Sequence, residues 1–313
     1  MRVLVTGGSG IVGHYVIDEL YKKGHEVVNA DVVRMGDLSH SGTTGTASAA
    51  VAMEMRKGWP RLPRFFQVEI SDYGQVISAM DGCDAVISLA SRPSAANYTE
   101  EDVFVTNVSS MWNVCRAAEQ LKISRVVLGS SYNAVGAMGT AARWQPKEVK
   151  PPEYFPLDQH VYTRSEDPYS IAKWIGEEVG QGFARRSPWM SIASMRFNGM
   201  WDDNYFRQLA ANPVTDPWTR CQGFWTYLHI RDAARACVMS VESEGWTGHN
   251  RLFLNADDTM INIPTMEAIQ TVYPDVPVRE PLEGFLAPIS TRLAGDLIGW
   301  RPLYSWRDDQ FQP

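Results

Sequence analysis

A glycine-rich turn between a strand and a helix near the amino terminus constrains the fold more than any other feature of the sequence. Residues 3–5 are Val-Leu-Val and predict a short buried strand, residues 6–10 cannot continue it, and apolar residues recur at helical spacing from Ile11. Residues 8–13 also satisfy the pattern G-x-G-x-x-G. Glycine is needed there because a pyrophosphate must approach the backbone closely, where free N–H groups and the helix dipole favour an anion. The turn predicts dinucleotide binding, with an ordinary strand–turn–helix as the alternative.

The second predicted strand, residues 25–30, ends in Asp31. A carboxylate about 20 residues beyond the glycines reads the ribose 2′-hydroxyl of a dinucleotide and repels a 2′-phosphate. Asp31 therefore favours NAD over NADP, although the nearby Arg34 softens that preference.

Bulk properties limit the classes of function. The 313 residues carry a net charge of −7, which argues against a nucleic-acid or anionic-membrane surface. The four cysteines form no CxxC pair and show no metal-ligand spacing, so we expect reduced, buried thiols and no metal site. A core strand begins at the first residues and no apolar run approaches 18 residues, so we expect neither a signal peptide nor a membrane span, and a cytoplasmic protein.

Strands and helices alternate along the first two thirds of the chain. Strands are predicted at residues 65–68, 84–90, 125–129 and 191–197, and helices at 73–80, at 99–121 and from Pro168. This order indicates βαβ units and an α/β fold, a Rossmann-type doubly wound parallel sheet. Asp72 is expected to contact adenine, to cap the helix that follows it, or both. We interpret residues 39–50 as a flexible excursion and residues 137–168 as a loop forming a wall over the site.

The segments after Asn198 are shorter and less regular. Helices are predicted at residues 204–211, 230–241 and 264–272, and strands at 224–228 and 251–254. We therefore expect a dinucleotide-binding domain over residues 1–198 and a small C-terminal α+β substrate-binding cap over residues 199–313.

Polar side chains that can perform chemistry follow the fifth predicted strand. Ser130 and Ser131 stand at its carboxyl end, where ligands bind in open parallel sheets, although they could simply begin a polar loop. Tyr169 and Lys173 are four residues apart and share one face of the next predicted helix. The pattern gains weight from its position in the chain, and the alternative is that Tyr169 is an ordinary packing aromatic.

Taken together, these residues resemble the extended short-chain dehydrogenase/reductase superfamily, whose members are often called NAD-dependent epimerase/dehydratases. The resemblance rests on T-G-G-S-G-I-V-G at 6–13, Ser131 five residues before Gly136, Tyr169-x-x-x-Lys173, Arg196-Phe197 and L-H-I-R-D at 228–232. It implies that Ser131, Tyr169 and Lys173 form the catalytic set. It also implies a set of cofactor-binding residues: Gly7, Gly10, Ile11, Gly13, Asp31, Asp72, Leu89, Ala90, Asn107, Lys173 and Phe197.

Three departures from the family pattern bear on the substrate. Nucleotide-sugar members usually have Asn three residues after the arginine of the sixth strand, where this chain has Gly199, with Asn198 one place early. Trp225 occupies the usual place of an arginine that grips a diphosphate, and the stretch from Asn198 to His229 is short. Residues 226–229 look somewhat like the corresponding stretch of uronate dehydrogenases. We therefore expect a smaller, sugar-like substrate, contacted by Ser91, Tyr132, Asn133, Asn198 and Trp225.

Three functions remain open from the sequence. The first is an NAD-dependent oxidoreductase that acts on a secondary alcohol or hemiacetal carbon of a sugar-like compound. The second is a nucleotide-sugar epimerase or dehydratase that keeps its NAD, and the third is an inactive NAD-sensing regulator. We also expect a homodimer built from the helices that start near Thr99 and Pro168, because both carry apolar residues beyond the needs of one sheet face. These residues are Met111, Trp112, Ile171, Trp174 and Ile175.

Overall fold

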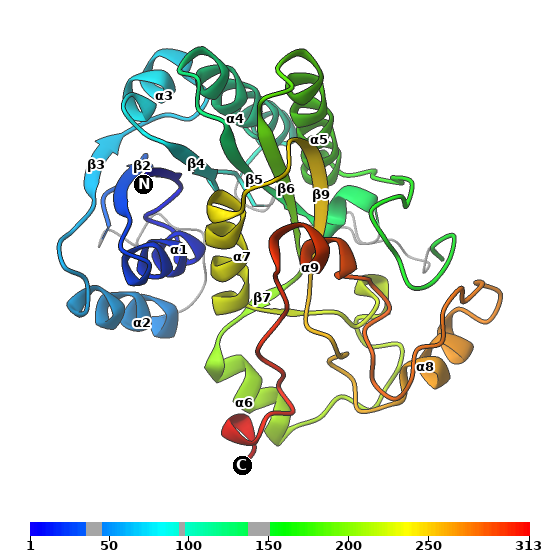
Figure 1. Cartoon of the computed structure of the whole chain (residues 1–313). Helices are drawn as coiled ribbons and strands as arrows, with labels where there is room; N and C mark the ends of the chain where they lie inside the picture. Colours follow the sequence, from blue (N-terminus) through cyan, green and yellow to red (C-terminus); the bar gives the residue numbers. More distant parts are fainter. Residues whose placement is uncertain (36–45, 94–97, 137–150) are drawn as a thin grey trace.

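Seven parallel strands form one sheet at the centre of the computed structural model, in the order β3-β2-β1-β4-β5-β6-β9 (Figure 1). The structure describes residues 1–35, 46–93, 98–136 and 151–313, without the side chains of 46–50 and 52. The strands are β1 Arg2–Thr6, β2 Glu26–Asp31, β3 Arg64–Gln67, β4 Ala85–Ser88, β5 Arg125–Ser131, β6 Ser191–Phe197 and β9 Gly248–Leu254.

Helices cover both faces of this sheet. One face carries α1 (Ile11–Lys22) and α7 (Ile230–Glu242), which pack against each other; the other carries α3 (Tyr73–Met80), α4 (Glu100–Gln120) and α5 (Pro168–Arg186) (Figure 1). The strand order reverses at β1, which lies between β2 and β4. The strand order, with helices on both faces of the sheet, confirms the predicted Rossmann-type doubly wound fold. In such folds, the point where the strand order reverses opens a crevice for ligands beyond the carboxyl ends of the strands.

Local sequence signals explain where the helices begin. Thr99 accepts from the backbone N–H of Asp102 and caps α4, as expected from its acidic first turn. Asp167 accepts from the N–H groups of Tyr169 and Ser170, and Pro168 follows it at the first helical position. These caps fix the register of the two helices, and hence the face of α5 that meets the sheet.

A second, aromatic-rich core lies beside the sheet in the C-terminal half. It is built from η2 (Tyr132–Val135), β7 (Met200–Trp201), α6 (Asp203–Ala211), η4 (Cys221–Gly223), β8 (Leu228–His229), α8 (Thr265–Val272) and η5 (Asp309–Phe311), while α9 (Arg292–Ile298) packs near β9 and α7. The predicted helices of this half are confirmed. The domain boundary at residue 198 stays a prediction. Two elements beyond it, α7 and β9, lie with the main sheet rather than with the second core.

Three expectations about the elements are wrong. Residues 251–254 form a strand, but it belongs to β9 of the main sheet rather than to the cap. Residues 224–228 do not form a strand, because Phe224 and Trp225 adopt positive φ angles of 54° and 56° and only Leu228 and His229 are extended. The flexible excursion predicted at 39–50 falls outside the described residues as far as 45, and from Thr46 the chain forms α2 (Thr46–Lys57).

Burial of individual side chains tests two further expectations. The four cysteines are buried and unpaired, as predicted. Met111, expected on the surface, is only 3% exposed because it fills the crossing between α4 and α5 beside Gly176. Trp112 is 44% exposed and packs edge-on against Phe183. Within the described ranges, no helix has the length and hydropathy needed to cross a bilayer.

Candidate active site at the carboxyl ends of β1, β4, β5 and β6

The glycine turn leaves no room for a side chain at Gly7 or at Gly13. Gly7 has φ 71°, and a Cβ atom there would stand 2.7 Å from the backbone nitrogen of Ala90. A Cβ at Gly13 would stand 2.4 Å from the carbonyl oxygen of Gly7, so Gly13 lets α1 pack against the turn. Gly10 begins α1 without a side-chain cap, and Ile11 behind it is partly exposed. Among the residues that the structure describes, the first-turn N–H groups of α1 therefore have neither an intrahelical nor a capping side-chain partner, which suits an anion.

Asp31 reaches from the end of β2 to this turn. Its Oδ2 accepts from the backbone N–H of Ser9 at 3.0 Å, and its Oδ1 accepts from that of Val33 at 3.3 Å. Burial raises the pKa of Asp31, while the backbone donors of Ser9 and Val33 oppose the rise. The structure thus brings the predicted ribose-reading carboxylate next to the predicted pyrophosphate site.

The other predicted cofactor residues occupy different places. Leu89 and Ala90 follow β4 beside the turn, and the N–H of Ala90 donates to Thr6 Oγ1 at 3.2 Å. The Asn107 amide is fully buried and bonds both the N–H and the carbonyl of Arg92, so it fixes the loop after β4. Asp72 is exposed and accepts from Gln75, which confirms the helix cap; its contact with adenine stays a prediction.

The three predicted catalytic side chains converge at the end of β5. Ser131 is the last residue of β5, pairs in register with Phe197 of β6, and lies close enough to the Tyr169 hydroxyl on α5 to favour its phenolate form. Lys173, one turn later on α5, is 3% exposed, and its Nζ lies 5.4 Å from the centroid of the Tyr169 ring. Lys173 Nζ donates to the carbonyl oxygen of Gly129 at 2.6 Å. One helix face and one strand end therefore hold all three groups.

Burial shifts both titratable groups of this trio. It raises the pKa of Tyr169 to about 12, against the Ser131 hydrogen bond, which favours the phenolate. It lowers the pKa of Lys173 to about 8, against the carboxylate of Glu177, which favours the ammonium. The chain's own groups leave Tyr169 protonated at neutral pH, so the lowered pKa that a general base needs has to arise when the site is loaded.

A buried ionic network lies directly behind the catalytic residues and was not predicted from the sequence. Glu177, one turn beyond Lys173 and fully buried, accepts from the Ser130 hydroxyl at 2.6 Å. Its two oxygens also accept from Arg196 Nε and Nη2 at 2.9 and 2.8 Å, and Arg251 Nε lies 3.0 Å from Oε2. Arg196 and the other partners hold the pKa of Glu177 low despite its burial. The sequence feature that could have indicated this network is Glu177 itself, an acidic residue four positions after Lys173 and therefore on the same, sheet-facing side of α5.

Four of the five predicted substrate residues lie near strand ends of this site, and one does not. Ser91 is partly buried, while Tyr132 and Asn133 are buried directly after Ser131. Asn198, buried after β6, has one side-chain nitrogen position without a partner among the described residues. Trp225 is different, because it is a core residue whose indole N–H donates to Pro217 O at 2.7 Å and whose ring packs on Tyr273. The expectation that Trp225 contacts substrate is therefore wrong.

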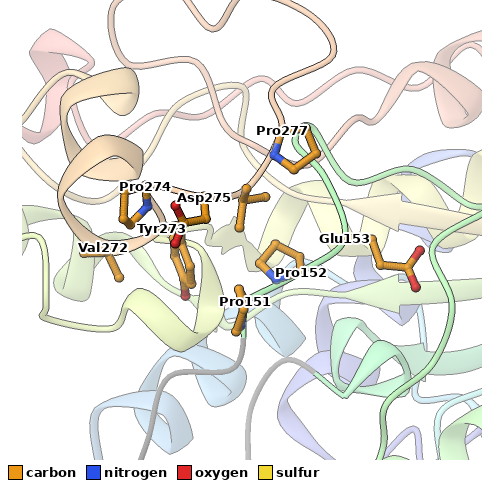
Figure 2. Close-up of a pocket in the computed structure, with 9 residues that line it drawn as sticks. Pro151, Pro152, Glu153, Val272, Tyr273, Pro274, Asp275 and Pro277 are labelled. Atoms are coloured by element: carbon orange, nitrogen blue, oxygen red, sulfur yellow. The ribbon is translucent and has the colours of Figure 1, made fainter.

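A groove of about 330 Å³ lies elsewhere, between residues 151–153 and the end of α8 (Figure 2). Figure 2 shows Pro151, Pro152 and Glu153 on one side, with Tyr273 and Pro277 across from them. None of the residues that line this groove is a predicted catalytic or cofactor residue. It is consequently set apart from the chemistry described above.

Comparison with known proteins decides the family. The model of the NAD dependent epimerase/dehydratase family matches residues 3–251, which include the glycine turn, Ser131, Tyr169 and Lys173. The chain belongs to this family. The family match spans both the glycine turn and the Ser-Tyr-Lys trio, so the recognised resemblance is confirmed.

Curated relatives of this family member match over part of its length. An NAD-dependent glucose-6-phosphate dehydrogenase from Haloferax volcanii is 31% identical over 181 residues, covering 57% of this chain and 63% of that protein. A putative UDP-glucose 4-epimerase from Methanocaldococcus jannaschii is 24% identical over 178 residues, covering 56% and 48%. The chain thus spans about half the length of the curated relatives it matches.

Solved structures agree with the fold over the whole chain. A short-chain dehydrogenase/reductase superfamily protein from Agrobacterium tumefaciens with bound NAD superposes with a TM-score of 0.68 at 17% identity, covering 99% of this chain and 94% of that one. UDP-glucose 4-epimerase from Bifidobacterium longum, in complex with NAD+ and UDP, gives a TM-score of 0.66 at 17% identity, with coverages of 100% and 96%. At these identities the likeness establishes the fold.

Proposed function

We propose that the chain is an NAD-dependent oxidoreductase that transfers hydride at a secondary alcohol or hemiacetal carbon of a sugar-like small molecule. The observation that carries this proposal is the convergence of Ser131 and Tyr169 at the carboxyl end of β5, with Lys173 one helical turn from Tyr169. An inactive sensor would not need this trio, which argues against the regulatory alternative.

The glycine turn fits NAD on the geometry of this chain. Gly7 and Gly13 admit no side chain, and Gly10 leaves the start of α1 uncapped, which suits a pyrophosphate. Asp31 is positioned to accept from a ribose hydroxyl and would repel a 2′-phosphate, which favours NAD over NADP. When bound, NAD supplies a nicotinamide ring that accepts a hydride.

The protein's own residues then handle the proton and the orientation. Tyr169 takes the proton from the substrate hydroxyl as general base, and Ser131 hydrogen-bonds the same oxygen and holds it beside Tyr169. Lys173 stabilises the phenolate by its positive charge and is also placed to hold the nicotinamide ribose. Gly129 and Glu177 keep the ammonium in place and charged.

The substrate we propose has no nucleotide handle. Trp225 stands in the core where many family members place a diphosphate-binding arginine, and the dehydrogenase from Haloferax volcanii is named for glucose 6-phosphate, a sugar without a nucleotide. The second candidate is a nucleotide-sugar epimerase that retains NAD, which the match to the relative from Methanocaldococcus jannaschii favours.

A substrate panel separates these two candidates. Free sugars, uronates, sugar phosphates and UDP-sugars are each incubated with the protein and NAD, and absorbance is followed at the nicotinamide band. Net NADH release with a free sugar, a uronate or a sugar phosphate supports the dehydrogenase. Conversion of a UDP-sugar with no net NADH supports the epimerase and overturns the leading proposal.

We further propose that the protein is a cytoplasmic homodimer. Four buried, unpaired cysteines are typical of a reducing compartment. Trp112, exposed on α4, and the partly buried Ile171, Trp174 and Ile175 of α5 support pairing of these helices with a second copy. Sedimentation at micromolar concentration tests the dimer, and a monomer contradicts it.

A further inference from the structure

Three neighbouring strands of the sheet bond one carboxylate on the catalytic helix. Glu177 of α5 is fully buried, and its oxygens accept from Ser130 on β5, from Arg196 on β6 and from Arg251 on β9. Arg196 supplies two of these contacts, so the donors together fill the acceptor capacity of a carboxylate. Glu177 is therefore a fixed negative charge behind the catalytic residues.

The ammonium of Lys173 lies one helical turn before this carboxylate, on the same face of α5. Lys173 is buried and donates to the carbonyl oxygen of Gly129, so the ammonium and the carboxylate are bonded to consecutive residues of β5. Burial lowers the pKa of Lys173, and Glu177 is the charged side chain among the described residues that opposes this fall. Any charge that offsets Glu177 therefore bears on the ammonium as well.

The other ionisable groups on the elements packed against α5 do not shift the pKa of Lys173 within the described part of the chain. Tyr169 on α5 and Tyr132 on η2 are neutral at pH 7, because burial raises the pKa of both phenols. His249 on β9 is neutral as well, because burial lowers its pKa to about 4. The remaining charged side chains on these elements are Arg125 of β5, Glu100, Glu101, Asp102, Arg116 and Glu119 of α4, and Glu178, Arg185 and Arg186 of α5.

The two arginines that bond Glu177 differ in their surroundings. The side chain of Arg196 is 4% exposed and grips Glu177 with two nitrogens. Arg251 lies on the edge strand β9, its side chain is 24% exposed, and it also donates to Glu178 at 2.6 Å. Without Arg251, Glu177 would still be bonded by Arg196 and Ser130. Arg251 is therefore an additional positive charge beside Glu177 and not the partner that keeps this carboxylate ionised.

We infer that Arg251 and Glu177 act in opposite directions on Lys173, with Glu177 attracting its ammonium and Arg251 offsetting that attraction from the edge of the sheet. This inference rests on the proposed function, which it deepens. Neither residue is a group that reacts, so both are positioning residues that act through Lys173. Removing the charge of Glu177 should weaken the ammonium, and removing the charge of Arg251 should strengthen it.

Lys173 itself reports these effects without cofactor or substrate. In protein that contains 13C-labelled lysine, the Cε resonance of Lys173 is followed by NMR between about pH 6 and 11, and is identified by its absence from Lys173→Met. We expect the titration midpoint to fall by about one pH unit in Glu177→Gln and to rise by about half a unit in Arg251→Met. Glu178→Gln is the matched control. It removes the half-exposed acid that binds the same arginine, and should leave the midpoint within about 0.2 units of the parent.

Replacement of Arg251 by lysine separates charge from packing. Lysine and methionine are both unbranched and of similar size, so they loosen the contacts of Arg251 alike, and only lysine restores the charge. We expect Arg251→Lys to titrate near the parent and below Arg251→Met. Equal midpoints in these two variants overturn the role of Arg251, and this comparison stands alone if Glu177→Gln does not fold. A folded Glu177→Gln whose midpoint does not fall overturns the role of Glu177.

NAD affinity is measured on the same variants across the same pH range. If Lys173 holds the nicotinamide ribose, the loss of affinity at high pH should move with each lysine midpoint, to lower pH in Glu177→Gln and to higher pH in Arg251→Met. An NAD affinity that does not follow the shifted midpoints overturns the ribose contact in the proposed function. The lysine midpoints alone decide the inference about Arg251 and Glu177.

Discussion

Lys173 Nζ donates to the carbonyl oxygen of Gly129 at 2.6 Å, which ties the catalytic helix α5 to strand β5 two residues before Ser131. The lysine is buried, and burial lowers its pKa to about 8. The ammonium is therefore present at pH 7 and is lost as the pH rises through about 8.

This titration predicts a pH dependence of NAD binding. If Lys173 holds the nicotinamide ribose, affinity for NAD falls above about pH 8, by roughly tenfold for the loss of a charge-assisted hydrogen bond. Lys173→Met should bind NAD weakly at pH 7 and show no further loss at higher pH. Titration of intrinsic fluorescence with NAD between pH 6.5 and 9.5 measures both. A Met variant that keeps the parental pH profile contradicts the assignment.

Asp31 should set the choice of cofactor. Its carboxylate stands beside Ser9 of the glycine turn, where a 2′-phosphate would meet like charge. We expect the parent to bind NAD at least tenfold more tightly than NADP, and Asp31→Ala to shrink that ratio. Calorimetric titration with both cofactors measures the ratio, and equal affinities in the parent refute the prediction.

We expect the Glu177 side chain to contribute much more to the free energy of unfolding than the side chain of its neighbour Glu178. Removing the carboxylate with Glu177→Ala leaves the buried Arg196 guanidinium without its partner, which should lower the free energy of unfolding by about 3–5 kcal/mol. Glu178→Ala removes a half-exposed partner of Arg251 and should cost less than about 1 kcal/mol. Urea unfolding of the two variants makes the comparison. Similar losses in both would show that the buried network contributes no more than a surface pair.

Two glycines of α5 should respond in opposite directions to the same substitution. A Cβ at Gly176 would stand 1.7 Å from Met111 Sδ, so Gly176→Ala should destabilise the protein by about 1–3 kcal/mol. A Cβ at Gly182 meets no atom within 4 Å, so Gly182→Ala should stabilise the helix by about 0.5–1 kcal/mol. Thermal unfolding checks both, and an unchanged Gly176→Ala melting temperature would contradict the packing described for α4 and α5.

The sequence predicts the Rossmann part well because its signals are local. The turn at residues 6–13, the caps at Thr99 and Asp167 and the spacing of Tyr169 and Lys173 each depend on neighbours within one or two helical turns. Signals of this kind do not depend on contacts between distant segments, so the parallel sheet and the catalytic trio could be predicted from the sequence alone.

The remaining features depend on contacts between distant segments. Residues 251–254 carry a strand pattern, but they pair with β6, which lies more than 50 residues earlier in the chain. No local sequence feature indicates which strand they pair with. Trp225 adopts a positive φ that its residue type disfavours, and its burial in the second core overrides that preference. Glu177 offered a weak signal as an acid on a sheet-facing helix position, although its partner Arg196 is 19 residues away in sequence.

Replacement of Tyr169 by phenylalanine tests the central claim most directly. Tyr169→Phe keeps the ring on α5 and deletes only the hydroxyl that Ser131 contacts. Once a substrate has been found, we expect the variant to bind NAD as the parent does and to lose at least 100-fold in kcat, the scale on which a general base contributes. A folded Phe variant that binds NAD normally and turns over the same substrate within threefold of the parent would contradict the role of Tyr169 as general base.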